Sequence, residues 1–151
     1  MGLAISGWVE ISWLSDFSFR DREKYSWNGA LNLYPLINVT DDISQLIFGY
    51  ANKKEYMEYK SYFKDRGIPE NISELLQVIV KRDHEFERQY PGEGNFGYSY
   101  AYLDEIEKIL VEESKLIANS DSDWIAFVGK IKSLFNNYDS RAIRIVVWFS
   151  Y

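Results

Sequence analysis

The sequence predicts a single α+β domain over residues 1–151, in which a small antiparallel or mixed sheet packs with four to five helices. Two observations lead to this prediction: alternating apolar residues mark a strand near each end of the chain, and apolar residues recur at helical spacing between them. A third is the length, without internal repeats or low-complexity linkers, which is typical of one domain. We expect the first and last strands to pair within one sheet.

The segments near both ends of the chain show the alternation that marks a strand. Between Leu3 and Leu14, apolar side chains line one face, and the other face mixes polar and apolar residues. Gly7 lies within this segment and indicates either a bulge or a close approach of another backbone. Between Arg141 and Tyr151 both faces are nearly apolar, so we expect this strand inside the sheet or covered on both sides.

The segments that follow the first strand are predicted to be irregular and then helical. Residues 15–29 are polar and turn-rich, which is typical of a loop or hairpin tip. Residues 31–37 are apolar, but Pro35 argues against a central strand, so they form either an edge strand or the entry to a helix. A helix is predicted over 41–48, with Thr40 as its N-cap and Gly49 at its exit, and another over 53–65, ended by Gly67.

Three further helices are predicted in the second half of the chain. The first follows Asn71 as N-cap, with Glu74 completing a capping box, and the glycine-rich loop 89–97 comes after it. The second is an amphipathic helix between Leu103 and Ile117. The third follows a cap formed by Ser120 and Asp123, and its dense apolar stripe over 124–135 predicts a place at the centre of the core.

Composition excludes several classes of function. The net charge is −6, which argues against general nucleic-acid binding because that affinity rests on cationic contacts to phosphate. The chain has no cysteine and a single histidine, His84, so we expect no metal site and assign no cofactor. No apolar run reaches the length of a membrane span, and no signal peptide is recognisable, so the cytoplasm is the expected location.

The glycine-rich loop does not match a nucleotide-binding motif. In the stretch that begins at Gly92, no Lys-Ser or Lys-Thr pair follows the glycines, and Glu93 would repel phosphate. Tyr98, Tyr100 and Tyr102 come next at alternating positions, so their rings share one face if the segment is extended. That face is either a binding platform or a cover over the edge of the core.

Glu10 is the carboxylate with the most unusual predicted surroundings. It lies on the mixed face of the first strand, between Trp8 and Ser12. A carboxylate held against tryptophan has its pKa raised by desolvation, as a general acid requires. An ion pair with Arg144 or Arg66 explains the position equally well.

Three islands of sequence resemble a family of small phage-borne and bacterial proteins of unassigned function. Members of that family open with MGCDIHxYVE, carry RGLPxDVS in mid-chain and continue with GHSHSWLTLxEL. This chain matches them, in order and spacing, at Met1-Gly2 with Val9-Glu10, at RGIPENIS (66–73) and at GYSYAYLDEI (97–106). The islands cover about a third of the chain.

The departures from the family pattern bear on function. Where relatives have Cys-Asp-Ile-His, this chain has LAIS at residues 3–6, and where they have His-Ser-His it has Tyr98, Ser99 and Tyr100. The resemblance therefore implies a site in which metal ligation and proton transfer have given way to contact. The candidate residues for binding a ligand or partner are Trp8, Glu10, Arg66, Tyr98, Tyr100, Tyr102 and Arg144.

Three functions remain open at this stage. The first is a non-enzymatic protein that binds a protein or a small ligand, as a toxin-immunity or phage anti-defence protein does. The alternatives are a structural or assembly protein that forms homo-oligomers through its aromatic strands, and a small hydrolase or lyase that uses Glu10 with a tyrosine and Arg66. Small size, acidity and many aromatic residues favour the first, and we assign no catalytic residue.

Overall fold

The computed structural model describes residues 3–12, 25–50 and 61–151 of the chain. The strands are β1 (Ala4–Ser12), β2 (Trp27–Asn32), β3 (Phe96–Tyr102) and β4 (Ile143–Ser150). The helices are α1 (Asp42–Phe48), α3 (Glu74–Gln89), α4 (Leu103–Glu112), α5 (Ser114–Ala118) and α6 (Trp124–Leu134), and a 3-10 turn at Ser140–Ala142 leads into β4.

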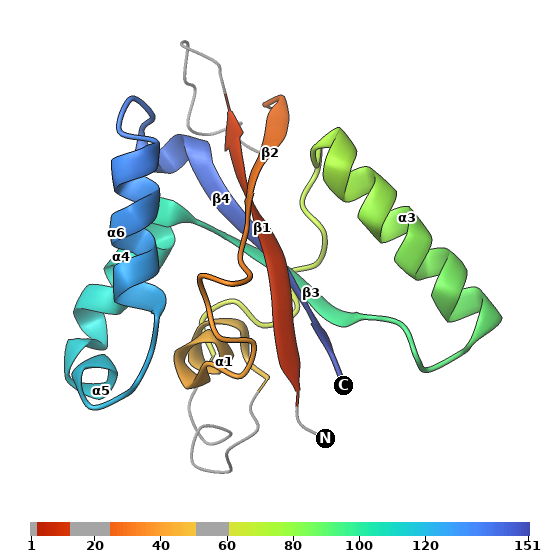
Figure 1. Cartoon of the computed structure of the whole chain (residues 1–151), viewed down its shortest axis with the longest axis horizontal. Coiled ribbons are helices and arrows are strands. Elements are labelled where there is room, and N and C mark those ends of the chain that lie inside the picture. Colours follow the sequence, from red (N-terminus) through yellow and green to blue (C-terminus); the bar gives the residue numbers. More distant parts are fainter. Residues whose placement is uncertain (1–2, 13–24, 51–60) are drawn as a thin grey trace.

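The four described strands form one antiparallel sheet in the order β2-β1-β4-β3 (Figure 1). The two central strands are the first and the last in the sequence, and their ladder runs from the Ala4–Ser150 pair to the Ile11–Ile143 pair. This confirms the α+β fold class and the predicted pairing of the two terminal strands. Seven of the eight residues of β4 are buried, as expected for a strand covered on both faces.

Gly7 allows β1 and β4 to approach each other closely beneath the segment that follows β2. A Cβ atom on Gly7 would lie 2.8 Å from Leu33 Cδ1 and would clash with the backbone oxygen of Val146. Of the two alternatives for this glycine, the structure therefore shows the close approach. The bulge in β1 lies further along, between Val9 and Glu10 on the side that pairs with β2.

The described helices are divided unequally between the two faces of the sheet. Helices α1, α4, α5 and α6 cover one face, where they form the main core, and α3 alone covers the other (Figure 1). Trp124 at the start of α6 is fully buried in this core, and its Nε1 donates a hydrogen bond to Ser44 Oγ of α1 at 2.6 Å. The predicted central place of the last helix is confirmed.

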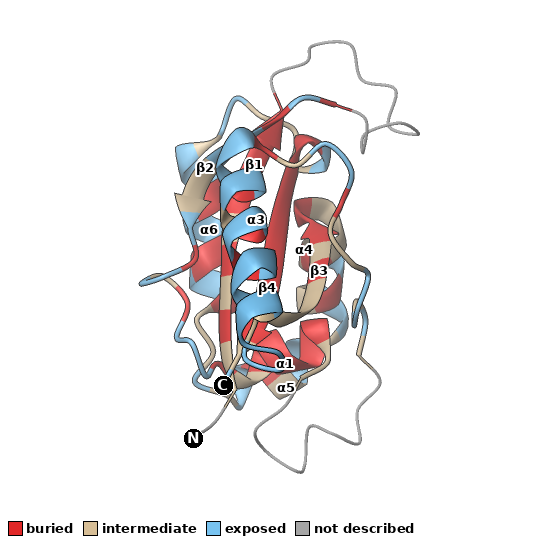
Figure 2. Cartoon of the chain, turned by 90° about the vertical axis from the view of Figure 1, so that its right-hand side faces the viewer, coloured by how far each residue is buried: buried red, intermediate tan, exposed pale blue. Residues whose placement is uncertain are grey.

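Helix α3 packs on its face of the sheet through few residues. Leu76 and Val80 point inward, where Leu76 clusters with Val146 and Trp148 of β4. The outer surface of the helix is exposed along its whole length (Figure 2). Because one side of this helix lacks a covering layer in the described chain, it is the most accessible element of this face.

Three helices begin later than the capping residues predicted. Helix α1 is capped by Asp41 rather than Thr40, because Asp41 Oδ1 accepts from the amides of Ile43 and Ser44. Helix α3 is capped by Ser73, whose Oγ accepts from Leu76 N, while Asn71 has a positive φ of 54° and lies in the preceding turn. Helix α6 begins after Asp123 rather than Ser120.

The remaining differences concern element boundaries. Residues 13–14 of the predicted first strand, 15–24 of the predicted loop and 53–60 of the predicted second helix lie outside the described residues. Residues 27–29 of the predicted loop belong to β2, and residues 61–65 of the predicted helix are not helical. The edge-strand alternative holds for the start of 31–37, because β2 begins at Trp27 and ends at Asn32, before a turn with a cis bond between Tyr34 and Pro35. The predicted helix 103–117 is divided into α4 and α5 at Glu113.

Candidate functional site

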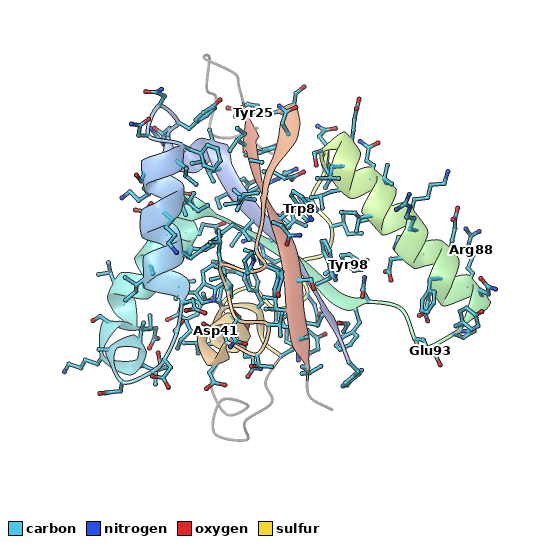
Figure 3. All side chains as sticks on the ribbon, viewed as in Figure 1. Trp8, Tyr25, Asp41, Arg88, Glu93 and Tyr98 are labelled. Carbon is cyan, nitrogen blue, oxygen red and sulfur yellow. The ribbon has the colours of Figure 1, made fainter. Side chains whose placement is uncertain are left out.

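The predicted site residues gather on the α3 side of the sheet. Strand β1 contributes Trp8 and Glu10, β4 contributes Arg144, and Arg66 lies in the segment that runs beside β3. Figure 3 shows Trp8 and Tyr98 between the sheet and α3. The aromatic cluster on this face consists of Trp8, Tyr98, Tyr100 and Trp148, packed with Val146 of β4 and with Ile72, Leu76 and Ile79 at and before α3.

Glu10 and Arg144 form a buried ion pair across the two central strands. They are direct partners in the β1–β4 ladder, and Arg144 Nε donates to Glu10 Oε1 at 2.7 Å. The other carboxylate oxygen accepts from Ser73 N at 2.6 Å. Arg144 Nη2 donates to the backbone oxygens of Glu70 and Asn71, at 3.2 and 3.4 Å. The pair therefore fixes the start of α3 to the middle of the sheet.

Three of the seven candidate residues are not accessible to a partner. Glu10 and Arg144 are both 0% exposed, and Tyr102 is 2% exposed, packed 6.0 Å from the ring of Trp27. A general acid must reach its substrate, and the Glu10 carboxylate is enclosed with both oxygens engaged. The prediction that Glu10, Tyr102 and Arg144 belong to a contact surface is therefore wrong. The ion-pair explanation of Glu10 is confirmed, with Arg144 rather than Arg66 as its partner.

Arg66 covers the outer edge of β3. Its Nη1 donates to the backbone oxygen of Tyr100 and to Glu105 Oε1, each at 3.1 Å. Its guanidinium carbon lies 4.5 Å from the ring centroid of Tyr100 and 4.8 Å from that of Phe63, within the range of a cation–π contact. Arg66 thus shields the edge of the sheet and holds the Tyr100 ring in place.

Tyr98 connects β3 to the second half of α3. Its hydroxyl donates to Asp83 Oδ2, and its ring lies 5.9 Å from Trp148 and 6.3 Å from His84. Burial raises the pKa of the Tyr98 hydroxyl, and the hydrogen bond to the Asp83 carboxylate raises it further. Tyr98 therefore has a structural role, because it holds α3 against the edge strand β3.

The glycine-rich loop is held by carboxylates of α3, which explains its composition without a phosphate ligand. Glu87 accepts from the amides of Gly92 and Gly94, at 2.7 and 2.6 Å, and these two bonds lower its pKa. Asp83 Oδ1 accepts from Asn95 N at 2.8 Å. A Cβ atom on Gly94 would lie 2.9 Å from the Glu87 Cβ, so a side chain at this position would displace the carboxylate.

We expect the stability of the fold to decline between pH 10 and 12, in part through Tyr98. An unfolded tyrosine ionises near pH 10, whereas the Tyr98 pKa is raised in the fold, so the unfolded state loses its proton first. Tyr50 behaves alike, because burial and a hydrogen bond to Asp65 raise its pKa to about 12. The stabilisation that each of these two hydroxyls gives to the fold is complete below pH 10, and it is lost as the pH rises through the pKa of that hydroxyl in the fold. Urea unfolding of wild type and Tyr98→Phe from pH 8 to 12 measures it; identical slopes would contradict the assignment.

The outer surface of α3 exposes four large apolar side chains. Leu75, Val78, Phe86 and Tyr90, the last of these at the C-cap, are 41, 49, 44 and 46% exposed, and the rings of Phe86 and Tyr90 lie 5.1 Å apart. Hollows lie along both flanks of the helix. The larger, of about 690 Å³, is lined chiefly by Ile72, Val80, Lys81, His84, Glu87 and Arg88. The other, of about 530 Å³, is lined by Ile79, Arg82, Asp83, Phe86, Glu93 and Asn95.

None of the four exposed apolar residues of this surface is among the predicted site residues. Helical spacing places Leu75, Ile79 and Phe86 near the same face as the buried Leu76, yet Leu75 and Phe86 are exposed. The available signal was the width of the apolar surface, since a stripe that also includes Val78 is too wide for one buried face. The polar residues Lys81, His84 and Arg88 of the same helix are also exposed.

Within residues 3–12, 25–50 and 61–151, no group of three or more His, Asp or Glu side chains is arranged to hold a metal ion. None of the helices in these segments is long and apolar enough to cross a membrane.

Comparisons with protein-family models, curated proteins and solved structures gave no match. The resemblance to the small phage-borne and bacterial proteins, carried by RGIPENIS and the two flanking islands, therefore stays a prediction.

Proposed function

We propose that the chain is a non-enzymatic binding protein that contacts a protein partner through the outer surface of α3, as a toxin-immunity or phage anti-defence protein does. One observation carries the proposal: Leu75, Val78, Phe86 and Tyr90 remain exposed on a helix that already buries Leu76 and Val80 against the sheet. A helix on the surface of a globular protein ordinarily presents polar side chains to solvent. A wide apolar surface rimmed by charges is typical of a protein-binding site.

The polar residues near this surface support binding rather than chemistry. Glu10 is enclosed with Arg144, and Asp83 and Glu87 hold the loop before β3 through backbone amides. A general acid or base must present an accessible oxygen to its substrate. These carboxylates instead keep the sheet, α3 and the loop in fixed positions, as a preorganised contact surface requires.

Site-specific cross-linking tests the proposal. A photoreactive phenylalanine analogue replaces Val78 or Phe86 on α3, and matched controls carry it at Val111 of α4 or Leu134 of α6, which are also exposed. After irradiation in the native host, the α3 positions should yield one adduct of defined mass that the controls lack. Equal labelling at all four positions, or no adduct at any, would contradict the proposal. An adduct of twice the chain mass would instead support the homo-oligomer.

A further inference from the structure

We infer that the partner adds an extended segment as a further strand along the outer edge of β2, with alternate side chains entering the hollow between β2 and the start of α3. This inference rests on the proposed function and specifies the kind of contact that the partner makes. Leu75, the first exposed apolar residue of the α3 surface, also lines this hollow. The edge of β2 and the proposed α3 surface are therefore parts of one continuous surface.

The two edges of the sheet differ in how they are covered. On β3, Gly67 N donates to the backbone oxygen of Tyr98 at 2.9 Å, and Arg66 covers the same edge. On β2, the backbone of Asn28–Leu31 makes no hydrogen bond outside its ladder with β1 in the part of the chain that the structure describes. In an antiparallel ladder, alternate residues of an edge strand direct their amide and carbonyl groups away from the partner strand. Strand β2 therefore presents unpaired backbone groups at its outer edge.

Strand β2 also lacks the residues that ordinarily protect an exposed edge. Edge strands commonly carry charged side chains or proline, which disfavour pairing with another chain. The sequence of β2, WNGALN, contains neither. Residues 27–29 pair in regular register with β1, and the register shift of this pair comes after them, opposite the Val9–Glu10 step. A regular, uncharged stretch of edge is therefore available for pairing.

The hollow beside this edge is lined by hydrogen-bonding groups from two elements. It has a volume of about 600 Å³, and its walls are residues 25–29 on one side and residues 71–75 and 77 on the other. The side chains of Ser26, Asn28 and Glu74 are exposed lining groups without a hydrogen-bond partner in the described residues. Hydroxyl, amide and carboxylate groups of this kind pair with the backbone and the polar side chains of an extended segment.

The start of α3 favours an isolated extended segment over a second copy of the chain. Leu75 lies on Gly29, since a Cβ atom on Gly29 would be 3.0 Å from Leu75 Cδ2. In a two-fold antiparallel pair of β2 strands that matches five or six residues, the two Gly29 residues lie within about 8 Å of each other. A helix with its side chains is about 10–12 Å wide, so the two α3 starts would occupy the same space. A strand without a covering helix meets no such obstacle.

Synthetic peptides test the inference directly. The probe is a fluorescein-labelled peptide of about nine residues that alternates threonine and valine, long enough to run past residues 25–29. Two control peptides keep the same side chains but are N-methylated on either the odd or the even backbone nitrogens. Fluorescence anisotropy with the full chain should show saturable binding of the probe, and one control should bind at least about tenfold more weakly because it lacks the amide donors that face β2. No saturable binding of the probe, or equal binding of all three peptides, would overturn the inference.

Substitution of Asn28 places the binding on β2. Asn28 is exposed and lies in the regular part of the edge, where a lysine disfavours pairing with another chain. Asn28→Lys should therefore weaken binding of the probe at least about tenfold. The matched control, Asn136→Lys, makes the same charge change at an exposed asparagine after α6 and should alter the dissociation constant less than about twofold. An equal loss in both variants would overturn the assignment to β2.

A measurement on the unaltered chain keeps the outcome independent of any folding defect in the variants. On addition of the probe, amide resonances of β2 (Trp27–Asn32) should shift, and at least one of these amides should exchange with solvent at least about tenfold more slowly. The resonances of α4 (Leu103–Glu112) should not shift. Shifts spread equally over both elements would contradict strand addition at β2.

Two further results separate this inference from the alternatives. Light scattering should give the mass of one chain, and a mass of two chains that Asn28→Lys returns to one would show pairing between copies and overturn the choice of partner. If the cross-links at Val78 and Phe86 form but the probe does not bind, strand addition is wrong and the proposed function stands. If neither result is obtained, both fail.

Discussion

Replacing Glu10 with alanine is expected to lower the free energy of unfolding by about 3–5 kcal/mol, because it leaves the Arg144 guanidinium buried without a counter-charge. The same change removes the acceptor for Ser73 N, which the Glu10 carboxylate binds at 2.6 Å. A buried donor that loses its partner adds its own desolvation cost. Urea unfolding followed by tryptophan fluorescence measures the loss.

The double variant Glu10→Leu with Arg144→Met separates the two sources of that loss. It removes both charges and replaces them with apolar side chains, so it should be more stable than Glu10→Ala alone. The backbone oxygens of Glu70 and Asn71 lose a donor in the double variant, which limits the recovery. If the double variant is no more stable than Glu10→Ala, the uncompensated charge is not the main cause of the loss.

Replacing Trp124 with alanine should be nearly as costly, lowering the free energy of unfolding by about 3–5 kcal/mol. Its side chain is fully buried between α1 and α6, 5.4 Å from the ring of Phe127 and 6.2 Å from that of Phe48. The substitution leaves a cavity and removes the Nε1 hydrogen bond to Ser44. Thermal unfolding checks the effect.

The adjacent residue of α6 supplies the control for this prediction. Ile125 is exposed, and Ile125→Ala should change the free energy of unfolding by less than about 0.5 kcal/mol. Both substitutions place alanine in the first turn of the same helix, so helix propensity acts alike in both. A loss at Ile125 equal to that at Trp124 would point to the helix rather than to its packing.

The two central strands could be predicted well because their signal is local, whereas β2 and β3 begin in segments predicted as loops. Alternation in β1 and the two-sided apolar pattern of β4 depend on the sequence of each segment alone, and both strands occur where that pattern predicts them. Helix starts were predicted less accurately because a cap is chosen by tertiary contacts. Asp41 caps α1 and also accepts from Asp123 N at the start of α6, a residue 82 positions away. The residues around Thr40 give no indication of that contact in the sequence.

The sequence predicted which tyrosines share one face of the strand, but it did not predict which of them are exposed. Alternation correctly placed Tyr98, Tyr100 and Tyr102 on one face of a strand, and all three belong to clusters on the α3 side. Which of them is enclosed depends on Trp27 and Arg66, which come from elsewhere in the chain. Likewise, the choice between Arg144 and Arg66 as the partner of Glu10 is made by strand register across 134 residues.

The adjacency of β1 and β4 sets the order of events during synthesis. Strand β1 is synthesised before its ladder partner β4, which is not made until residues 143–150. At the usual rate of elongation, that interval is on the order of ten seconds. During this time the strand at the middle of the finished sheet lacks the neighbour with which it shares its longest ladder, so the nascent polypeptide completes its sheet only after translation has passed β4.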